Sequence, residues 1–252
     1  METASKIPLR EVEAGRLSRF GAIDPTEGGN TSRANANFNL ELQLMDKLFL
    51  EQQLYYSYYT FELFSNFSFF DIDSVYGDQI RQVENRQLYG SKTSLSQYLN
   101  FGGLKVQNRI GFQLRSDFSK DNALSKTRSR TVLQYHVQKG DIRGTNTSAF
   151  AETEAEVGRW RFNLGLRYDL ISSGYRDELN HMDLMSKKAT QLSPKFSVQY
   201  QWSNFRFYAK TGRGFHSNDS RLVVLSDQLQ LSPSFGSDLG VVLIKGPIYA
   251  NV

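Results

Sequence analysis

The sequence predicts an all-β fold, an antiparallel up-and-down transmembrane β-barrel of which this chain supplies a part, with about nine strands. Stretches of ten or more residues alternate strictly between apolar and polar side chains, which is typical of strands with one apolar and one polar face. Strands of soluble proteins are shorter, at about five or six residues on average. Short turns also alternate with long polar connections, as they do between the two ends of an outer-membrane barrel.

Four stretches carry the alternation most clearly. In the third of them, Leu164 and Leu166 alternate with Gly165 and Arg167, so that apolar and charged side chains fall on opposite faces. We therefore expect four regular strands at 34–45, 104–115, 160–170 and 194–202.

Other predicted strands are less regular. The apolar phase of 48–70 shifts near Tyr58 and Tyr59, which predicts a β-bulge there. The stretch 79–99 alternates only weakly, and 147–157 places small residues on one face opposite a wetted row of glutamates. That row is Glu152, Glu154 and Glu156.

The connections between these strands fall into two classes. Tight turns are predicted at 45–47, 100–103, 157–159 and 202–204. Long polar connections are predicted at 71–79, within 118–146, at 172–189 and at 215–234. In an antiparallel meander this order places every long connection at one end of the sheet, and no helical periodicity interrupts it.

Alternation alone does not decide whether the apolar face meets a protein core or lipid. Strand length, the two loop classes and aromatic residues near strand ends favour the membrane. Exposing Arg161 and Arg167 to lipid would cost roughly 2–4 kcal/mol each at the bilayer centre. The apolar face is therefore expected to be the outer one, with outer-membrane lipid as its partner.

Composition excludes several other classes of protein. The chain has 252 residues and no cysteine, which excludes a disulfide framework and a thiolate metal site. The net charge is +4, but basic and acidic residues are interleaved, so we do not expect nucleic-acid binding. No apolar run is long enough for a transmembrane helix, and no metal site or cofactor is expected.

One motif is a candidate functional site. After a predicted strand, the chain continues as GRGFHSNDSR at 212–221. A catalytic role for His216 and Ser217 is disfavoured, because neighbouring residues of a strand point to opposite faces. A phosphate-binding loop would need a following helix. The simplest interpretation is a strand exit formed by Gly212, Arg213, Gly214 and Phe215, followed by a polar turn with His216, Asn218, Asp219 and Arg221.

Several segments together resemble the TonB-dependent outer-membrane receptors. The segments, in matching order and spacing, are RFGAIDPTEGGNTSR (19–33), LFSNFSFF (63–70), NRIGFQLRSD (108–117), FAETEAEVGRWRFNLGLRYDL (150–170), SPKFSVQY (193–200) and FRFYAKTGRGFHSNDSR (205–221). The resemblance implies a barrel of about twenty-two strands that encloses an N-terminal plug and imports scarce nutrients, most often ferric siderophores, without enzymatic activity. It also implies the outer membrane of a Gram-negative bacterium and energy from the TonB complex, which engages the plug.

The chain departs from that pattern at both ends, and we expect an internal fragment that lacks the plug and the C-terminal strands. The expected division is an extracellular loop segment at 1–33, a partial barrel at 34–245 and a truncated tail at 246–252. A passive porin-like channel and a soluble β-rich binding protein stay open as alternatives.

The resemblance also gives the polar turn an expected role. It places His216, Asn218, Asp219 and Arg221 at the extracellular rim, near the path of a small-molecule cargo. A ferric chelate that carries carboxylates or catecholates is anionic, and Arg and His suit such a ligand.

Overall fold

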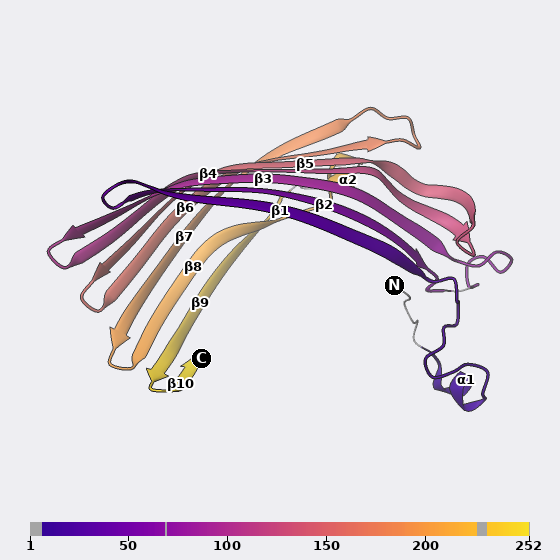
Figure 1. Ribbon diagram of the computed structural model, residues 1–252, viewed down its shortest axis with the longest axis horizontal. Helices are drawn as coiled ribbons and strands as arrows, with labels where there is room; N and C mark the ends of the chain where they lie inside the picture. Colours follow the sequence, from indigo (N-terminus) through magenta and orange to yellow (C-terminus); the bar gives the residue numbers. More distant parts are fainter. Residues whose placement is uncertain (1–6, 69, 226–230, 252) are drawn as a thin grey trace.

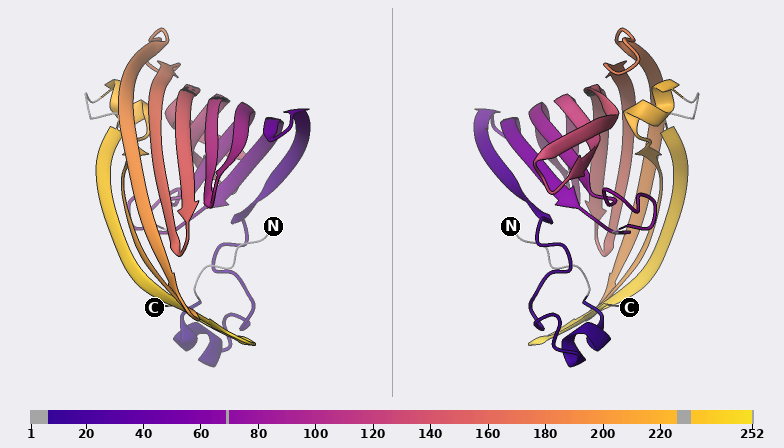
Figure 2. Two further views of the ribbon diagram at one scale, coloured as in Figure 1. Left: turned by 90° about the vertical axis from the view of Figure 1, so that its left-hand side faces the viewer. Right: turned by 90° about the vertical axis from the view of Figure 1, so that its right-hand side faces the viewer.

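The computed structural model describes residues 7–68, 70–225 and 231–251. Ten antiparallel strands form one sheet in which each strand pairs with its neighbours in the sequence. The sheet is an open, curved wall (Figures 1 and 2). The strands are β1 (Gly28–Met45), β2 (Leu48–Ser65), β3 (Ile80–Phe101), β4 (Leu104–Arg128), β5 (Val132–Val157), β6 (Trp160–Asp177), β7 (Met185–Trp202), β8 (Phe205–Ser217), β9 (Leu231–Lys245) and β10 (Ile248–Asn251). The partial up-and-down architecture predicted from the sequence is thus confirmed.

Two boundaries differ from the expected division of the chain. The sheet begins at Gly28 rather than at residue 34, because the polar residues 28–33 pair with β2 although they lack apolar alternation. Residues Ile248–Asn251 of the expected tail form β10, paired with β9, which raises the strand number from about nine to ten. Residues 1–6 of the expected loop segment and Val252 of the expected tail lie outside the described residues.

The described residues contain two short helices, which no helical periodicity predicts, and one of them interrupts the meander. Helix α1 (Leu9–Glu13) lies in the N-terminal segment, away from the sheet (Figures 1 and 2). Helix α2 (Ser220–Leu225) lies between β8 and β9. Within the described ranges, neither helix nor any other has the length and apolar character to cross a membrane.

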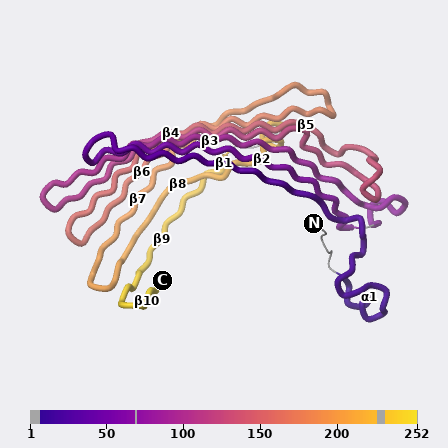
Figure 3. Tube along the Cα trace, viewed as in Figure 1, coloured from indigo at the N-terminus to yellow at the C-terminus, as the bar shows by residue number. Residues whose placement is uncertain are grey.

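The two ends of the sheet differ as the sequence predicts. Tight turns join the strands at one end, on the left and lower left of Figure 3. Residues with positive φ close them, among them Lys47 (φ 65°), Gly158 (φ 58°) and Ser203 (φ 50°). Positive φ matches the twist of a two-residue hairpin. We call the opposite end the long-loop end.

At the long-loop end, much of the expected connecting chain is strand. Strands β4 and β5 continue to Arg128 and from Val132, so that 118–146 is a paired ribbon closed by a short turn. Strand β6 likewise continues to Asp177, and β7 begins at Met185. Where both faces of a sheet meet water, the backbone ladder forms without apolar alternation, which is why the sequence pattern did not reveal these extensions.

The bulge expected near Tyr58 and Tyr59 is absent. Both residues keep an unbroken register, with Tyr58 opposite Gln87 and Tyr59 opposite Arg86 in β3. The apparent phase shift arises because Tyr59 and other aromatic residues lie on the same face as the polar side chains. The Tyr59 ring there contacts the Arg33 guanidinium at 4.9 Å.

One face of the sheet carries exposed apolar side chains, and the opposite face carries mainly polar side chains. Along β6, Leu164 is 62% exposed and Leu166 and Leu170 are also exposed, whereas Asp169 is fully buried. Tyr175, on the same side as Asp169, is buried too. We call the side that carries Leu164 the apolar face and the side that carries Asp169 the polar face. A soluble barrel would bury the first and expose the second, so the arrangement agrees with the predicted orientation.

Candidate functional site

A short helix covers part of the polar face at the long-loop end. Helix α2 packs against β5, β6 and β7. Its Val223 is completely buried, and the facing Tyr175 of β6 is buried as well. Burying an aliphatic side chain stabilises a contact by about 1.5–3 kcal/mol, which holds this short helix against the sheet.

The path of β8 explains how the helix reaches the polar face. Strand β8 pairs with β7 only as far as Gly212, opposite Lys195, but it pairs with β9 as far as Ser217. Beyond Gly212 the β8–β9 pair therefore separates from β7. The motif expected to be a strand exit, Gly212 to Phe215, lies at this fork. The residues that follow it, 216–225, fold back over the polar face instead of continuing outward, and we call them the folded-back segment.

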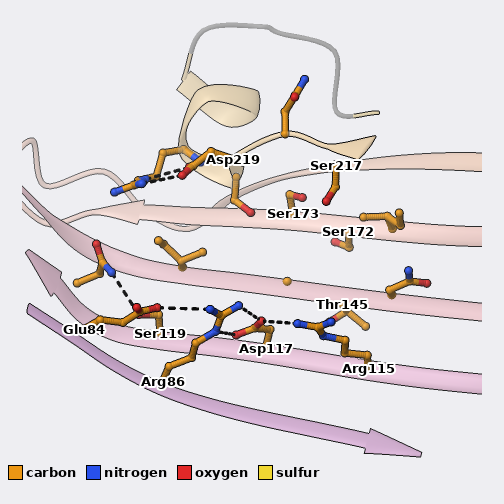
Figure 4. A pocket seen from close by; sticks show the side chains of 18 of the residues that line it. Glu84, Arg86, Arg115, Asp117, Ser119, Thr145, Ser172, Ser173, Ser217 and Asp219 are labelled. Atoms are coloured by element: carbon orange, nitrogen blue, oxygen red, sulfur yellow. Dashed lines mark hydrogen bonds and ion pairs between the residues drawn. The ribbon is translucent and has the colours of Figure 1, made fainter. Parts of the chain in front are cut away.

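A pocket of about 460 Å³ lies between this folded-back segment and the sheet. Figure 4 shows Ser217 and Asp219 on one side of it, across from Thr145, Ser172 and Ser173 on the sheet. Strands β3 to β6 supply the floor and walls, which are mostly polar or charged.

Charged residues on β3 and β4 form a linked row at the pocket floor. The Arg86 Nε donates to Asp117 Oδ1 at 2.7 Å, and its second terminal nitrogen also contacts this carboxylate. Arg115 reaches Asp117 Oδ2 at 3.5 Å, and Glu84 lies 3.8 Å from Arg86. Two guanidinium groups thus share one carboxylate, and Figure 4 shows the row in one view.

The folded-back segment adds a third guanidinium group. Arg221 donates from Nε to Asp219 Oδ1 at 2.9 Å and from a terminal nitrogen to Asp219 Oδ2 at 2.6 Å. It also donates to Gln138 Oε1 of β5 at 3.0 Å. The hydrogen bonds from Arg221 hold the pKa of the Asp219 carboxyl below its ordinary value, although burial opposes this shift. The pair therefore stays charged at neutral pH.

The four residues expected at the extracellular rim do not all line the pocket. Asn218, Asp219 and Arg221 line the pocket, whereas His216 is exposed and does not line it. Asp219 is engaged by Arg221 rather than by His216, which removes the acid that a catalytic pair would need.

Sequence reasoning missed the charged floor, Arg86, Arg115 and Asp117. Arg86 lies in the weakly alternating stretch 79–99, and the pairing register brings it beside Asp117. This part of the register is unbroken from Asn85, opposite Lys120, to the tight turn after Phe101. The alternation of β4 does assign Arg115 and Asp117 to the polar face, and this was the available signal.

A second polar cluster ties the rim of the long-loop end together. The Asp78 carboxylate accepts hydrogen bonds from the N–H groups of Ile72 (2.9 Å) and Asp73 (2.8 Å) and from Lys126 Nζ (3.2 Å). Burial alone would raise the pKa of Asp78, but these hydrogen bonds lower it well below its ordinary value. Asp78 and Lys126 thus join the connection after β2 to the far end of β4.

Gln79 extends this cluster to the N-terminal segment. Its side-chain oxygen accepts from Thr127 Oγ1 (3.2 Å) and from the Arg130 N–H (2.8 Å), and its nitrogen donates to Thr26 Oγ1 (2.6 Å). Among the described residues, no group of three or more His, Asp or Glu side chains is placed to hold a metal ion.

Acid is expected to loosen this rim cluster. The folded-state pKa of Asp78 lies below its unfolded value of about 3.9, so its contribution to stability is complete above about pH 4. That contribution is lost as the pH falls through the lowered pKa. Protease cleavage within 66–79, measured on the receptor from pH 7 down to pH 3 with an acid-tolerant protease, should rise only at the acidic end. Loosening toward alkaline pH would contradict the assignment.

The fold and the site together define a class of protein. A curved antiparallel sheet with an exposed apolar face, a polar inner face and long strands is the wall of a transmembrane β-barrel. The chain matches the family described as TonB dependent receptor-like, beta-barrel, over residues 10–240. It belongs to this family. No curated protein matches the chain.

Solved receptor structures share the fold. The unliganded ferric citrate transporter FecA superposes with a TM-score of 0.78 at 14% identity, over 94% of this chain and 35% of FecA. The siderophore receptor PiuA from Acinetobacter baumannii gives 0.66 at 12% identity, over 86% of this chain and 38% of PiuA. The copper transporter OprC gives 0.65 at 17% identity, over 87% and 38%. The chain therefore spans a little over a third of the length of these proteins.

Proposed function

We propose that this chain forms part of the barrel wall of an outer-membrane receptor that imports a scarce nutrient, such as a ferric siderophore, into a Gram-negative bacterium. Its partners are then outer-membrane lipid on the apolar face, a small-molecule cargo in the pocket, and the TonB complex acting through a plug domain. The family membership supports this role, as do structural neighbours whose names include a ferric citrate transporter and a siderophore receptor. The role is transport rather than catalysis.

The pocket beneath α2 is the observation that carries the proposal. It lies on the polar face, which is the inner face of a barrel wall, and it opens near the long-loop end. Its three guanidinium groups, on Arg86, Arg115 and Arg221, each already contact a carboxylate. An anionic chelate can replace the protein carboxylate at Arg86 or Arg221, which are both bidentate, because arginine binds a ligand carboxylate with the same geometry.

The division of the chain follows from this proposal. Residues 1–33 form an extracellular segment whose last residues enter β1, and 34–245 form the barrel wall. Of the tail 246–252, residues Ile248–Asn251 continue the meander as β10, beyond the turn that follows β9. The extensions of β4 and β5 project the outer part of the ribbon, residues 121–142, above the bilayer on the extracellular side, because a span needs only about 9–11 residues.

Replacing Arg221 by Ala in the full-length receptor is expected to weaken cargo binding roughly tenfold or more, because a hydrogen bond to a charged group contributes about 1.5–3 kcal/mol. His216→Ala should have a smaller effect, since His216 is exposed outside the pocket. Binding of ferric citrate and of a ferric catecholate, and growth on each under iron limitation, would measure the effect.

The matched control is Arg213→Ala, which removes an exposed arginine of β8 that lies outside the pocket. Equal affinity in the Arg221 and Arg213 variants would contradict the proposed cargo site. If the intact receptor instead passes ions freely in liposomes without cargo, it is a porin-like channel and the transport proposal fails.

A further inference from the structure

A second groove, of about 410 Å³, lies at the long-loop edge of the apolar face. Its floor is aromatic and exposed, formed by Tyr58, Tyr89 and Phe118 of three successive strands. The Tyr89 and Phe118 rings meet edge to face, with their centroids 6.3 Å apart. The Tyr89 hydroxyl donates to Gln87 Oε1 at 2.7 Å, which fixes its polar tip at the border of the groove. These side chains face outward, away from the cargo pocket.

The acidic residues of the groove are engaged by neighbours. The Asp121 N–H donates to Asp141 Oδ1 at 3.1 Å. Lys139 Nζ lies 3.9 Å from Asp121 Oδ1, and Arg176 lies 3.6 Å from Asp141 Oδ2. Asp141 thus has Arg176 within ion-pair distance, whereas Asp121 shares Lys139 with Glu178, whose carboxylate lies closer to Lys139 Nζ at 2.6 Å.

The basic residues of the groove differ in this respect. Lys120 and Arg143 are exposed, and their side chains form no hydrogen bond or ion pair with the part of the chain that the structure describes. Together with Lys139 and Arg176, these two cations outnumber the neighbouring carboxylates of Asp121, Asp141 and Glu178 by one, which leaves a net positive charge beside the aromatic floor.

The position of the two bases relative to the bilayer is set by β4. Its exposed apolar side chains run through Ile110, Phe112 and Leu114 to Phe118, and Lys120 comes next. Arg143 pairs directly with Phe118 across the β4–β5 ladder. Both bases are therefore the first charged positions of β4 and β5 at the end of the apolar band, where the headgroups of the leaflet on the long-loop side begin.

We propose that this groove binds the phosphorylated headgroup of a lipid in the extracellular leaflet. Lys120 and Arg143 contact the phosphate, and Tyr58, Tyr89 and Phe118 pack against the first part of the acyl chain. Arginine and lysine bind phosphate through charge-assisted hydrogen bonds, and aromatic rings favour the interface between headgroup and hydrocarbon. The inference depends on the membrane placement proposed above, but it does not depend on the cargo.

The test uses the full-length receptor, purified in detergent and titrated with dihexanoyl phosphatidate. Dihexanoylglycerol, which lacks the phosphate, and inorganic phosphate, which lacks the acyl chains, are titrated in parallel. Native mass spectrometry reports the occupancy. Phosphatidate should bind at least tenfold more tightly than either comparison molecule, and Lys120→Gln together with Arg143→Gln should weaken it roughly tenfold or more.

The matched control combines Lys105→Gln and Lys210→Gln, which remove the same charge from exposed positions on the polar face. This variant should bind phosphatidate like the wild type, and cargo uptake should persist in both double variants. Unchanged phosphatidate affinity after loss of Lys120 and Arg143 would overturn the proposal, as would equally tight binding of inorganic phosphate. Because uptake is measured separately, a failure of the cargo site does not imitate either outcome.

Discussion

A receptor that carries Leu164→Arg is expected to fail to insert, or to insert in much lower yield than the wild type. Leu164 is 62% exposed in the middle of β6, between the exposed side chains of Phe162 and Leu166 on the apolar face. A guanidinium group at the bilayer centre costs roughly 2–4 kcal/mol, a large part of a typical net stability of about 5–15 kcal/mol. The folded fraction, read from heat-modifiable migration after refolding into lipid, measures the effect.

The neighbouring position provides the control. Asn163 lies on the polar face, directly opposite Glu154 of β5. Asn163→Arg introduces the same guanidinium group one residue away, where water solvates it and the carboxylate of Glu154 lies opposite. The folded fraction should be close to that of the wild type. Equal folded fractions for the Leu164 and Asn163 variants would show that the apolar face does not meet lipid.

Replacing Asp78 by Asn is expected to release the connection between β2 and β3 from the rim. Asn has nearly the same shape, but it lacks the charge that attracts Lys126, and it has one carbonyl oxygen in place of two carboxylate oxygens. One of the N–H groups of Ile72 and Asp73 would lose its acceptor. The Lys126 side chain, only 10% exposed, would lose its counter-ion in a poorly solvated site.

Hydrogen exchange at the amides of Ile72 and Asp73 measures this release directly, and faster proteolysis of the same connection should accompany it. Asp71→Asn is the control, because Asp71 is exposed in the same connection and makes the same change in charge. Slow exchange in the Asp78 variant, or equally fast exchange in both variants, would show that the carboxylate of Asp78 does not hold this loop.

The alternation of single strands was sufficient to predict the architecture but not the pocket. In β6, Leu164 and Arg167 alone assign the two faces, because strand periodicity is a local property. The contact between Arg86 and Asp117 depends instead on the register between β3 and β4, which is unbroken from Asn85 to the turn after Phe101. A single sequence does not display such pairing.

Helix α2 and the fork in the sheet show a second limit. The segment Ser220–Leu225 is too short to display helical periodicity, and its place depends on packing against β5, β6 and β7, which are distant in sequence. The glycines at Gly212 and Gly214 did mark the point at which β8 separates from β7. They did not indicate whether the chain continues outward or folds back.

The order in which the pocket forms during folding follows from its composition. Arg86 of β3 and Arg221 beyond β8 line the same cavity, so every strand between them must join the sheet before the cavity exists. Contacts between residues so far apart in sequence form slowly, because the loop-closure entropy is lost before the contact is gained. A ligand of this cavity therefore recognises only chains that have completed this part of the wall, and its binding stabilises them over every earlier folding stage.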